Sequence, residues 1–337
     1  MSKIKVAIIG ASGYTGLELV KLILNHPTFE IGYLATTNGD VDIQKLHPSL
    51  EGVIDFSVDS ANIDAIASTC SLAFLALPHK SAMSVAKELI AKDIKVIDLS
   101  ADYRLDLETY ESAYCPHEDK DNLKHSAYGL IEYFREDIKR AKVVASPGCY
   151  PTATLLGLLP FIPYLKENTP IFVDAKSGVS GAGKKLTNTN TFVTINENIF
   201  SYNPIKHRHA PEIKEKINKL YNKEFQINFV PHLIPITRGE LVSIYAQLKE
   251  NINPIEILKE HYKGEEFIRV RQSPVNVKDV AGTHFCDIFS INNDGSLYIN
   301  SAIDNLLRGA ASQALVAANI AMGLEESAGV PKIAYVP

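Results

Sequence analysis

The stretch GASGYTG, residues 10–16, follows the apolar segment KVAII and precedes a segment with helical periodicity. Gly10, Gly13 and Gly16 have a GxxGxxG spacing, and Ser12 stands where dinucleotide-binding motifs usually have a second glycine. A strand that ends in a glycine turn and leads into a helix is typical of the first βαβ unit of a parallel sheet, and the free N–H groups at the helix start suit a pyrophosphate. We therefore predict a dinucleotide site here. The alternative is a turn that only lets the helix pack closely on the sheet.

Strand-like and helical segments alternate through the first half of the chain. The apolar runs EIGYLATT, LAFLAL, KVIDLS and KVVAS are separated by helical patterns, which predicts an α/β domain with a parallel sheet wrapped by helices. The second half has longer strands at less regular spacing, typical of a mixed sheet, with helices expected near 152–165, 211–221 and 254–262. The final segment IDNLLRGAASQALVAANIAMGL predicts a long helix that docks on one domain or on the seam between them.

The bulk composition is that of a soluble protein. The chain has 337 residues, 46% of them hydrophobic and 22% charged, which leaves room for two domains. A net charge of −5 gives no sign of binding to nucleic acid or to an anionic membrane. MSKIKVAIIG is expected to be a first strand and no signal peptide. The four cysteines form no short pair, which favours reduced thiols over disulfides or a zinc site, so we predict a cytoplasmic protein without a bound metal.

The end of the second predicted strand indicates which dinucleotide would bind. NAD-dependent folds usually have an Asp or Glu there, about 20 residues after the glycine turn, to bind the ribose hydroxyls. Here the strand ends in Thr36, Thr37 and Asn38, so no carboxylate would repel a 2′-phosphate. This favours NADP. No Arg stands at this point, so a more distant cation such as Lys45 is expected to help.

Cys149 lies in the stretch SPGCYPTA, between a predicted strand end and a predicted helix, and Pro151 suits the first helical turn. The positive end of a helix dipole lowers the pKa of a thiol and favours the thiolate, which is the nucleophilic form. Cys70, Cys115 and Cys286 lack this arrangement. A cysteine often serves only as a small buried residue, but the glycine before Cys149 and the helix after it favour a nucleophile.

The segment KHRHAPEI offers a proton partner for such a thiolate. His207 and His209 come just before a predicted helix, whose dipole keeps an imidazole neutral and so suits a general base. Lys206 and Arg208 add positive charge that can bind a phosphate or carboxylate. One of the two histidines is expected to be a surface or packing residue. An HxH metal site is the alternative, but no third ligand cluster is evident.

Two other stretches contain candidate binding residues. LSADYRL contains Arg104, which can bind a substrate anion. KSGVSGAGKK follows a predicted strand, and its backbone around Ser177 and Gly178 can donate to a phosphate or to the cofactor. A flexible loop that only covers the cleft is the alternative for this stretch.

With GASGYTG, FLALPH, VIDLSADYRL, SPGCYPTA, VDAKSGVSGAG, HRHAPEI, FVPHLIP and AIDNLLRGAA in this order, the chain resembles the N-acetyl-gamma-glutamyl-phosphate reductases of arginine biosynthesis nearly from end to end. That family is similar in fold to aspartate-semialdehyde dehydrogenase and glyceraldehyde-3-phosphate dehydrogenase. The resemblance implies a Rossmann-type, doubly wound dinucleotide-binding domain over residues 1–148, completed by the C-terminal helix, residues 306–337. It implies an α+β catalytic and dimerisation domain with a mixed sheet over residues 149–305.

The resemblance also implies a reaction. Cys149 would accept the acyl group of N-acetyl-L-glutamyl 5-phosphate as a thioester, inorganic phosphate would leave, and NADPH would reduce the thioester to N-acetyl-L-glutamate 5-semialdehyde. His209 would be the base, and His207, Arg208 and Arg104 would bind the substrate. A homodimer or homotetramer is expected. The residues expected to hold the cofactor are Gly10, Ser12, Gly13, Tyr14, Thr15, Gly16, Ser177 and Gly178.

Some positions depart from the family's usual pattern. Thr237 stands in LIPITRGEL where Asn is common, and ATTNGD lacks the usual Arg. The same chemistry on the aminoadipate or aspartate analogue is therefore an alternative, although aspartate enzymes usually have an Asn where Gly148 stands. A non-catalytic sensor that binds NADP is an alternative of a different class. It gives no reason for Cys149 and His209 at two helix starts.

Overall fold

The computed structural model describes residues 3–335, and the chain divides into two compact units. The first unit holds residues 3–147 together with 310–330, and the second holds residues 148–309 together with 331–335. Among the described residues, no helix combines the length and the apolar character that crossing a membrane requires.

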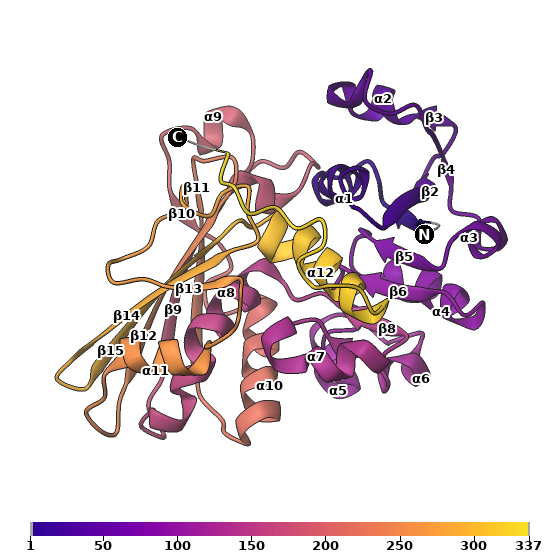
Figure 1. The fold of residues 1–337 in the computed structure, drawn as a ribbon. Coiled ribbons are helices and arrows are strands. Elements are labelled where there is room, and N and C mark those ends of the chain that lie inside the picture. Colours follow the sequence, from indigo (N-terminus) through magenta and orange to yellow (C-terminus); the bar gives the residue numbers. More distant parts are fainter. Residues whose placement is uncertain (1–2, 336–337) are drawn as a thin grey trace. The chain divides into compact units, whose positions relative to one another are not determined.

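The first unit is built on an eight-stranded sheet (Figure 1). Its strands are β1 (Ile4–Ile9), β2 (Phe29–Thr36), β3 (Val41–Asp42), β4 (Ser57–Ser60), β5 (Leu72–Leu75), β6 (Lys95–Asp98), β7 (Ala127–Tyr128) and β8 (Val143–Ala145). They lie in the order β3-β4-β2-β1-β5-β6-β8-β7, and neighbours run parallel except β3 and β4. The order reverses at β1, as in doubly wound dinucleotide-binding sheets, so the predicted Rossmann-type fold is confirmed.

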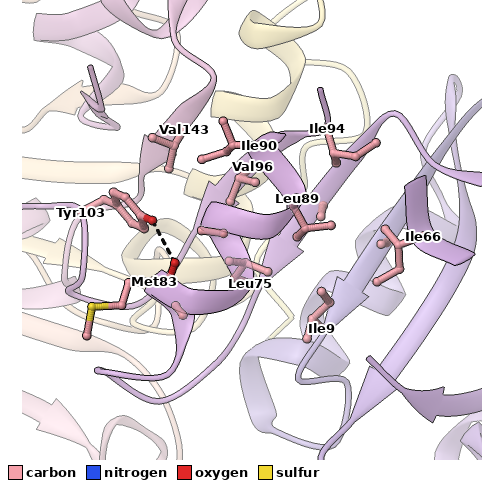
Figure 2. Packing of buried hydrophobic residues seen from close by; sticks show 14 of the residues in the cluster. Ile9, Ile66, Leu75, Met83, Leu89, Ile90, Ile94, Val96, Tyr103 and Val143 are labelled. Carbon is pink, nitrogen blue, oxygen red and sulfur yellow. Dashed lines mark hydrogen bonds between the residues drawn. The ribbon is translucent and has the colours of Figure 1, made fainter. Parts of the chain in front are cut away.

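Helices cover this sheet because its strands are apolar on both faces. They are α1 (Tyr14–Leu24), α2 (Ile43–Leu46), α3 (Ile63–Thr69), α4 (Ala82–Ala91), α5 (Leu107–Ala113), α6 (Lys120–Leu123) and α7 (Ile131–Arg140). Successive strand residues point to opposite faces. Ile9 of β1 and Leu75 of β5 therefore pack on one side with Ile66 of α3 and Leu89 of α4, and all four side chains are buried (Figure 2).

The helix near the end of the chain, α12 (Ser312–Ala321), belongs to the first unit, where it contacts α7, α1 and β6. All of its residues are buried, and Gln313 donates from Nε2 to the carbonyl oxygen of Gly129 at 2.6 Å. The helix is shorter than predicted. A π-helical turn, Leu307–Ala311, precedes it, and residues 331–335 return to the second unit.

The second unit is built on a mixed, seven-stranded sheet in the order β10-β11-β9-β12-β15-β14-β13 (Figure 1). Its strands are β9 (Ile171–Gly178), β10 (Phe200–Ser201), β11 (Ile227–Ile234), β12 (Glu240–Gln247), β13 (Ile268–Val270), β14 (Cys286–Asn293) and β15 (Ser296–Ile303). β9 and β11 run parallel, whereas β12 pairs antiparallel with both β9 and β15. The predicted mixed sheet is confirmed.

Helices α8 (Cys149–Leu158), α9 (Phe192–Ile195), α10 (His209–Tyr221) and α11 (Pro254–His261) complete the second unit. α8 is nearly enclosed: it packs on β12 and β15 and against α10. The helix predicted over 152–165 in fact begins at Cys149 and ends at Leu158. The chain then continues as a 3₁₀ turn, Leu159–Tyr164, because Pro160 and Pro163 have no N–H to donate to an α-helix.

Candidate active site

The glycine loop between β1 and α1 is a tight turn in which two glycines have no room for a side chain. Gly10 has a φ of +100°, and a Cβ there would lie 2.3 Å from the carbonyl oxygen of Ala76. A Cβ on Gly16 would lie 2.3 Å from the carbonyl oxygen of Gly10. Gly13 caps α1 without a side-chain hydrogen bond, and a Cβ on it would meet no atom closer than 3.7 Å. The loop therefore fits a dinucleotide pyrophosphate beside the first N–H groups of α1.

Ser12 belongs to the same turn, Tyr14 and Thr15 begin α1, and none of the three is fully buried. Beyond β2, the Thr36 hydroxyl accepts the N–H of Gly39 at 3.2 Å, so a turn follows the strand. No carboxylate stands at positions 36–39. Lys45, expected to help bind a 2′-phosphate, makes an ion pair with Asp42 at 3.0 Å. Both side chains are largely exposed, so this ion pair is weak and leaves the ammonium able to bind a phosphate.

Cys149 is the first residue of α8, and Gly148 caps the helix in an extended conformation. The thiol is half-buried and forms no disulfide. It lies at the positive end of α8, where an anion is stabilised. Burial has the opposite effect on Cys70, where it raises the pKa to about 11.

The start of α10 lies against the start of α8. Glu212, in the first turn of α10, accepts the N–H of Gly148 at 3.1 Å and is buried. His209 is the first residue of α10 and is also buried. The centroid of its ring is 5.8 Å from that of Tyr150, the residue after Cys149. The two helix starts therefore bring an imidazole and a thiol into one region.

Of His207 and His209, His207 is the one that packs among aromatic side chains. Its ring lies against those of Tyr150, Tyr202 and Phe229. Its Nδ1 accepts the N–H of His209 at 3.2 Å. Burial, assisted by the charge of Arg208, lowers the pKa of His207 to about 4, so the imidazole is neutral at physiological pH. Arg208 caps α10 and is exposed.

Sequence reasoning missed a buried carboxyl group in β12, the strand on which α8 packs. Glu240 is the first residue of β12 and is fully buried. Burial raises its pKa to about 8. Because this pKa is higher in the folded chain than the usual 4.5, the unfolded chain loses the proton first, and the free energy of unfolding falls as the pH rises from about 4.5 to 8. In the sequence Glu240 follows a turn, where acidic side chains are usually exposed, so nothing distinguished it as a candidate.

Gly309 packs directly against Cys149 and was also missed. A Cβ on Gly309 would lie 2.6 Å from the Cβ of Cys149, so a larger residue would displace the nucleophile. Gly309 belongs to the π-helical turn, a form that is frequent at functional sites. Its neighbour Arg308 is fully buried and contacts His284 at 2.5 Å.

Ser177 and Gly178 are the last residues of β9. Ser177 is buried and pairs with Glu240 on β12. The N–H of Gly178 donates to the carbonyl oxygen of Gly239 at 2.9 Å, and the next two amides donate to the same turn. Contrary to expectation, the Gly178 amide is therefore no free donor for a cofactor.

Arg104 lies in the first unit and is buried. It donates from Nε to the carbonyl oxygen of Ser146 and from Nη2 to that of Leu99, both at 2.8 Å. These bonds join the ends of β6 and β8, a structural role that the sequence did not suggest. The neighbouring Asp98 is fully buried, and burial raises its pKa to about 7.

The predicted site residues thus fall into two groups. The glycine loop, residues 10–16, and Arg104 belong to the first unit. The second unit brings together Cys149, His209, His207, Arg208, Ser177 and Gly178. Within residues 3–335, no group of three or more His, Cys, Asp or Glu side chains is arranged to hold a metal ion.

Comparison with known families identifies both units. The profile of the semialdehyde dehydrogenase NAD-binding domain matches residues 5–141, and that of the semialdehyde dehydrogenase dimerisation domain matches residues 149–305. A curated N-acetyl-gamma-glutamyl-phosphate reductase from Sulfurovum sp. (strain NBC37-1) is 63% identical over 99% of this chain and 100% of its own length. Its counterpart from Wolinella succinogenes is 59% identical over 100% of both chains.

Solved structures agree on the fold. Aspartate semialdehyde dehydrogenase II from Vibrio cholerae, complexed with ASA, has a TM-score of 0.72 at 17% identity and covers 96% of this chain and 99% of its own. The Candida albicans aspartate semialdehyde dehydrogenase with NADP has a TM-score of 0.71 at 15% identity and covers 95% and 98%. At such identities the likeness concerns the fold alone.

Proposed function

Because the chain belongs to the N-acetyl-gamma-glutamyl-phosphate reductases, we propose that it converts N-acetyl-L-glutamyl 5-phosphate into N-acetyl-L-glutamate 5-semialdehyde and inorganic phosphate, with NADPH as reductant. The observation that carries the mechanism is the meeting of two helix starts, where Cys149 begins α8 and His209 begins α10. A thiol there can accept an acyl group, and a nearby imidazole can move a proton. Reduction of an acyl phosphate through a thioester requires both.

In the first step, the sulfur of Cys149 attacks the acyl carbon. A C–S bond forms, and the bond to phosphate breaks with its electron pair on the phosphate oxygen. The positive end of α8 stabilises the sulfur as an anion before the attack. Gly309 keeps the space beside Cys149 open because any Cβ there would collide with the cysteine.

After reduction, the thioester carbon carries a negative oxygen and remains bonded to sulfur. His209 donates a proton to this oxygen and takes it back as the C–S bond breaks, which releases the semialdehyde. His207 positions this imidazole, since it accepts the N–H of His209 while packed among aromatic rings. In this proposal His207 influences the reaction by positioning His209 and does not itself bind the substrate.

NADPH supplies the hydride when it is bound. We assign its pyrophosphate to the glycine loop, with the N–H groups of Tyr14, Thr15 and Gly16 at the start of α1 as donors beside Ser12. The absence of a carboxylate at the end of β2 supports NADP over NAD. Of the two residues at the end of β9, Ser177 stays our candidate for a cofactor contact, because the Gly178 N–H donates within the sheet.

Apart from its phosphate, the substrate carries one negative charge, on its α-carboxylate. Arg208, exposed at the start of α10, supplies a cation on the same helix as His209 and is the candidate ligand for a substrate carboxylate. The Arg104 guanidinium donates to backbone carbonyl oxygens at the ends of β6 and β8, so we propose that it positions these strand ends.

We further propose a cytoplasmic homodimer or homotetramer. Residues 149–305 match a domain described as a dimerisation domain. Large apolar side chains are exposed on three strands of its sheet: Phe172, Tyr245 and Ile291. A second copy packed on this sheet would bury them.

The test is the reverse reaction, phosphate-dependent reduction of NADP with N-acetyl-L-glutamate 5-semialdehyde. The aminoadipate and aspartate semialdehyde analogues are assayed beside it, and NAD beside NADP. We expect turnover that requires phosphate, prefers NADP and is at least about tenfold faster with the glutamate derivative, since one methylene changes transition-state binding by about 1–3 kcal/mol. Faster turnover of the aminoadipate or aspartate analogue would identify that derivative as the substrate instead. Binding of NADP without turnover on any of the three would favour the sensor.

A further inference from the structure

We propose that His47 is a positioning residue for the coenzyme: its imidazole holds the carbonyl oxygen of Ala11 and so keeps the glycine loop in the form that binds a pyrophosphate. This inference rests on the proposed function, which places the NADP pyrophosphate at that loop, residues 10–16. His47 is assigned no contact with the coenzyme and acts through the loop.

The first argument is the contact between His47 and the loop. The Nε2 atom of His47 lies 2.7 Å from the carbonyl oxygen of Ala11, a good distance for a hydrogen bond. A carbonyl oxygen only accepts, so Nε2 carries the hydrogen and donates it. Both residues are buried, with 6% of His47 and none of Ala11 exposed. Water therefore has little access to replace the imidazole at this carbonyl.

The second argument is the direction of the loop's dipoles. The carbonyl oxygen of Gly10 accepts the N–H of Gly13 at 3.3 Å, and that of Gly13 accepts the N–H of Leu17 at 3.0 Å. The carbonyl oxygen of Ala11, in contrast, is bound by a side chain from a distant part of the sequence. A phosphate is bound by N–H donors, and a carbonyl oxygen turned toward it would repel it. His47 therefore removes a repulsive dipole that the loop and α1 do not remove themselves.

Holding one carbonyl group also fixes the amide that follows it. The Ala11–Ser12 peptide is trans, so its C=O and N–H are coplanar and point in opposite directions. The bond to His47 thus sets the direction of the Ser12 N–H as well. Glycine restricts the backbone least of all residues, and Gly10 and Gly13 flank this peptide. Without the imidazole, the peptide would be freer to rotate.

The third argument is that a rigid segment, residues 41–56, presents His47. Its strand β3 pairs with β4, and the N–H of Ile43 donates to the carbonyl oxygen of Phe56 at 3.0 Å. Pro48 disfavours helical dihedrals in the residue before it, and α2 ends there: His47 has a φ of −136° and a ψ of 85°. The imidazole is therefore held from a fixed backbone.

The same segment carries Lys45, the candidate cation for the 2′-phosphate of NADP. The two side chains lead to different expectations. NADP and NAD share the pyrophosphate, so a residue that acts through the glycine loop affects the binding of both alike. A cation that meets the 2′-phosphate affects the binding of NADP alone.

The test replaces His47 by Phe, which keeps a ring and removes the donor, and by Gln, which can donate from its own Nε2. His26→Phe is the matched control. His26 is a buried imidazole of the same unit, with Nε2 3.1 Å from Oδ1 of Asn319. It precedes β2, whereas the glycine loop follows the parallel strand β1, so the two lie at opposite ends of these strands. Calorimetry on the full chain without substrate measures the Kd of NADP and of NAD, and thermal unfolding shows that each variant is folded.

We expect His47→Phe to raise the Kd of NADP and that of NAD by a similar factor, about tenfold. His47→Gln should recover most of this loss, and His26→Phe should leave both Kd values unchanged. Lys45→Ala should weaken NADP and not NAD. Unchanged Kd values in folded His47→Phe would overturn the proposal. So would an equal loss in His26→Phe, or a loss confined to NADP, which would place His47 at the 2′-phosphate.

Amide hydrogen exchange in the coenzyme-free protein measures the order of the loop itself. The peptide that covers residues 10–16 should exchange faster in His47→Phe than in wild type, and an unchanged rate would contradict the positioning role. Weaker binding by His47→Phe, in a protein that turns over none of the three semialdehydes, would keep this role and reject the proposed function. Normal turnover together with unchanged binding by His47→Phe would do the reverse.

Discussion

Cys149→Ser lowers kcat by at least about 10³-fold, the largest effect expected from any substitution in this chain. A serine hydroxyl at the start of α8 is not ionised at neutral pH, and the helix dipole is too weak to change that. An oxygen ester would also accept hydride less readily than a thioester. The measurement is phosphate-dependent reduction of NADP with N-acetyl-L-glutamate 5-semialdehyde, with NADP binding followed separately to show that the first unit is intact.

Cys115→Ser is the matched control, because Cys115 is half-buried like Cys149 but lies in the first unit, near the hydroxyl of Tyr110. It should retain essentially the wild-type rate. A folded Cys149→Ser protein with more than about a tenth of that rate would rule out covalent catalysis by this cysteine.

The second large effect is that of His209→Asn, which we expect to lower kcat by about 10²–10⁴-fold with little change in NADP binding. The loss arises because no group then moves the proton of the substrate oxygen. Single-turnover release of phosphate should fall less than the reduction step, because the positive end of α8 already favours the thiolate before the attack.

His261→Asn is the control for this prediction. His261 ends α11 in the same unit, where its ring packs against Tyr262. It should leave both steps unchanged. If His209→Asn slowed phosphate release as strongly as reduction, the assignment of His209 to the substrate oxygen would be wrong.

Much of the fold could be predicted because its signals are local. The strand, glycine turn and helix at residues 4–24 follow from apolar runs and from glycines whose positions allow no Cβ. The starts of α8 and α10 were expected within a few residues for the same reason: Gly148 precedes one, and proline stands in the first turn of both. These local signals also singled out Cys149 and His209.

The rest depends on contacts between distant parts of the chain. Glu240 is buried because β12 pairs with β9 and β15 and packs against α8, whereas a strand start would normally expose a carboxyl. Gly309 matters because it touches Cys149, about half the chain away. Arg104 was predicted from its charge, yet it donates to backbone carbonyls that only the folded sheet brings together.

The most direct test of the account is to mix the protein with freshly prepared N-acetyl-L-glutamyl 5-phosphate without NADPH and to analyse the protein by mass spectrometry. We predict one phosphate released per chain and one N-acetylglutamyl group on the peptide that contains Cys149, which NADPH then removes as the semialdehyde. Release of phosphate without an acyl group on the protein, or with the group on another residue, would contradict the thioester mechanism.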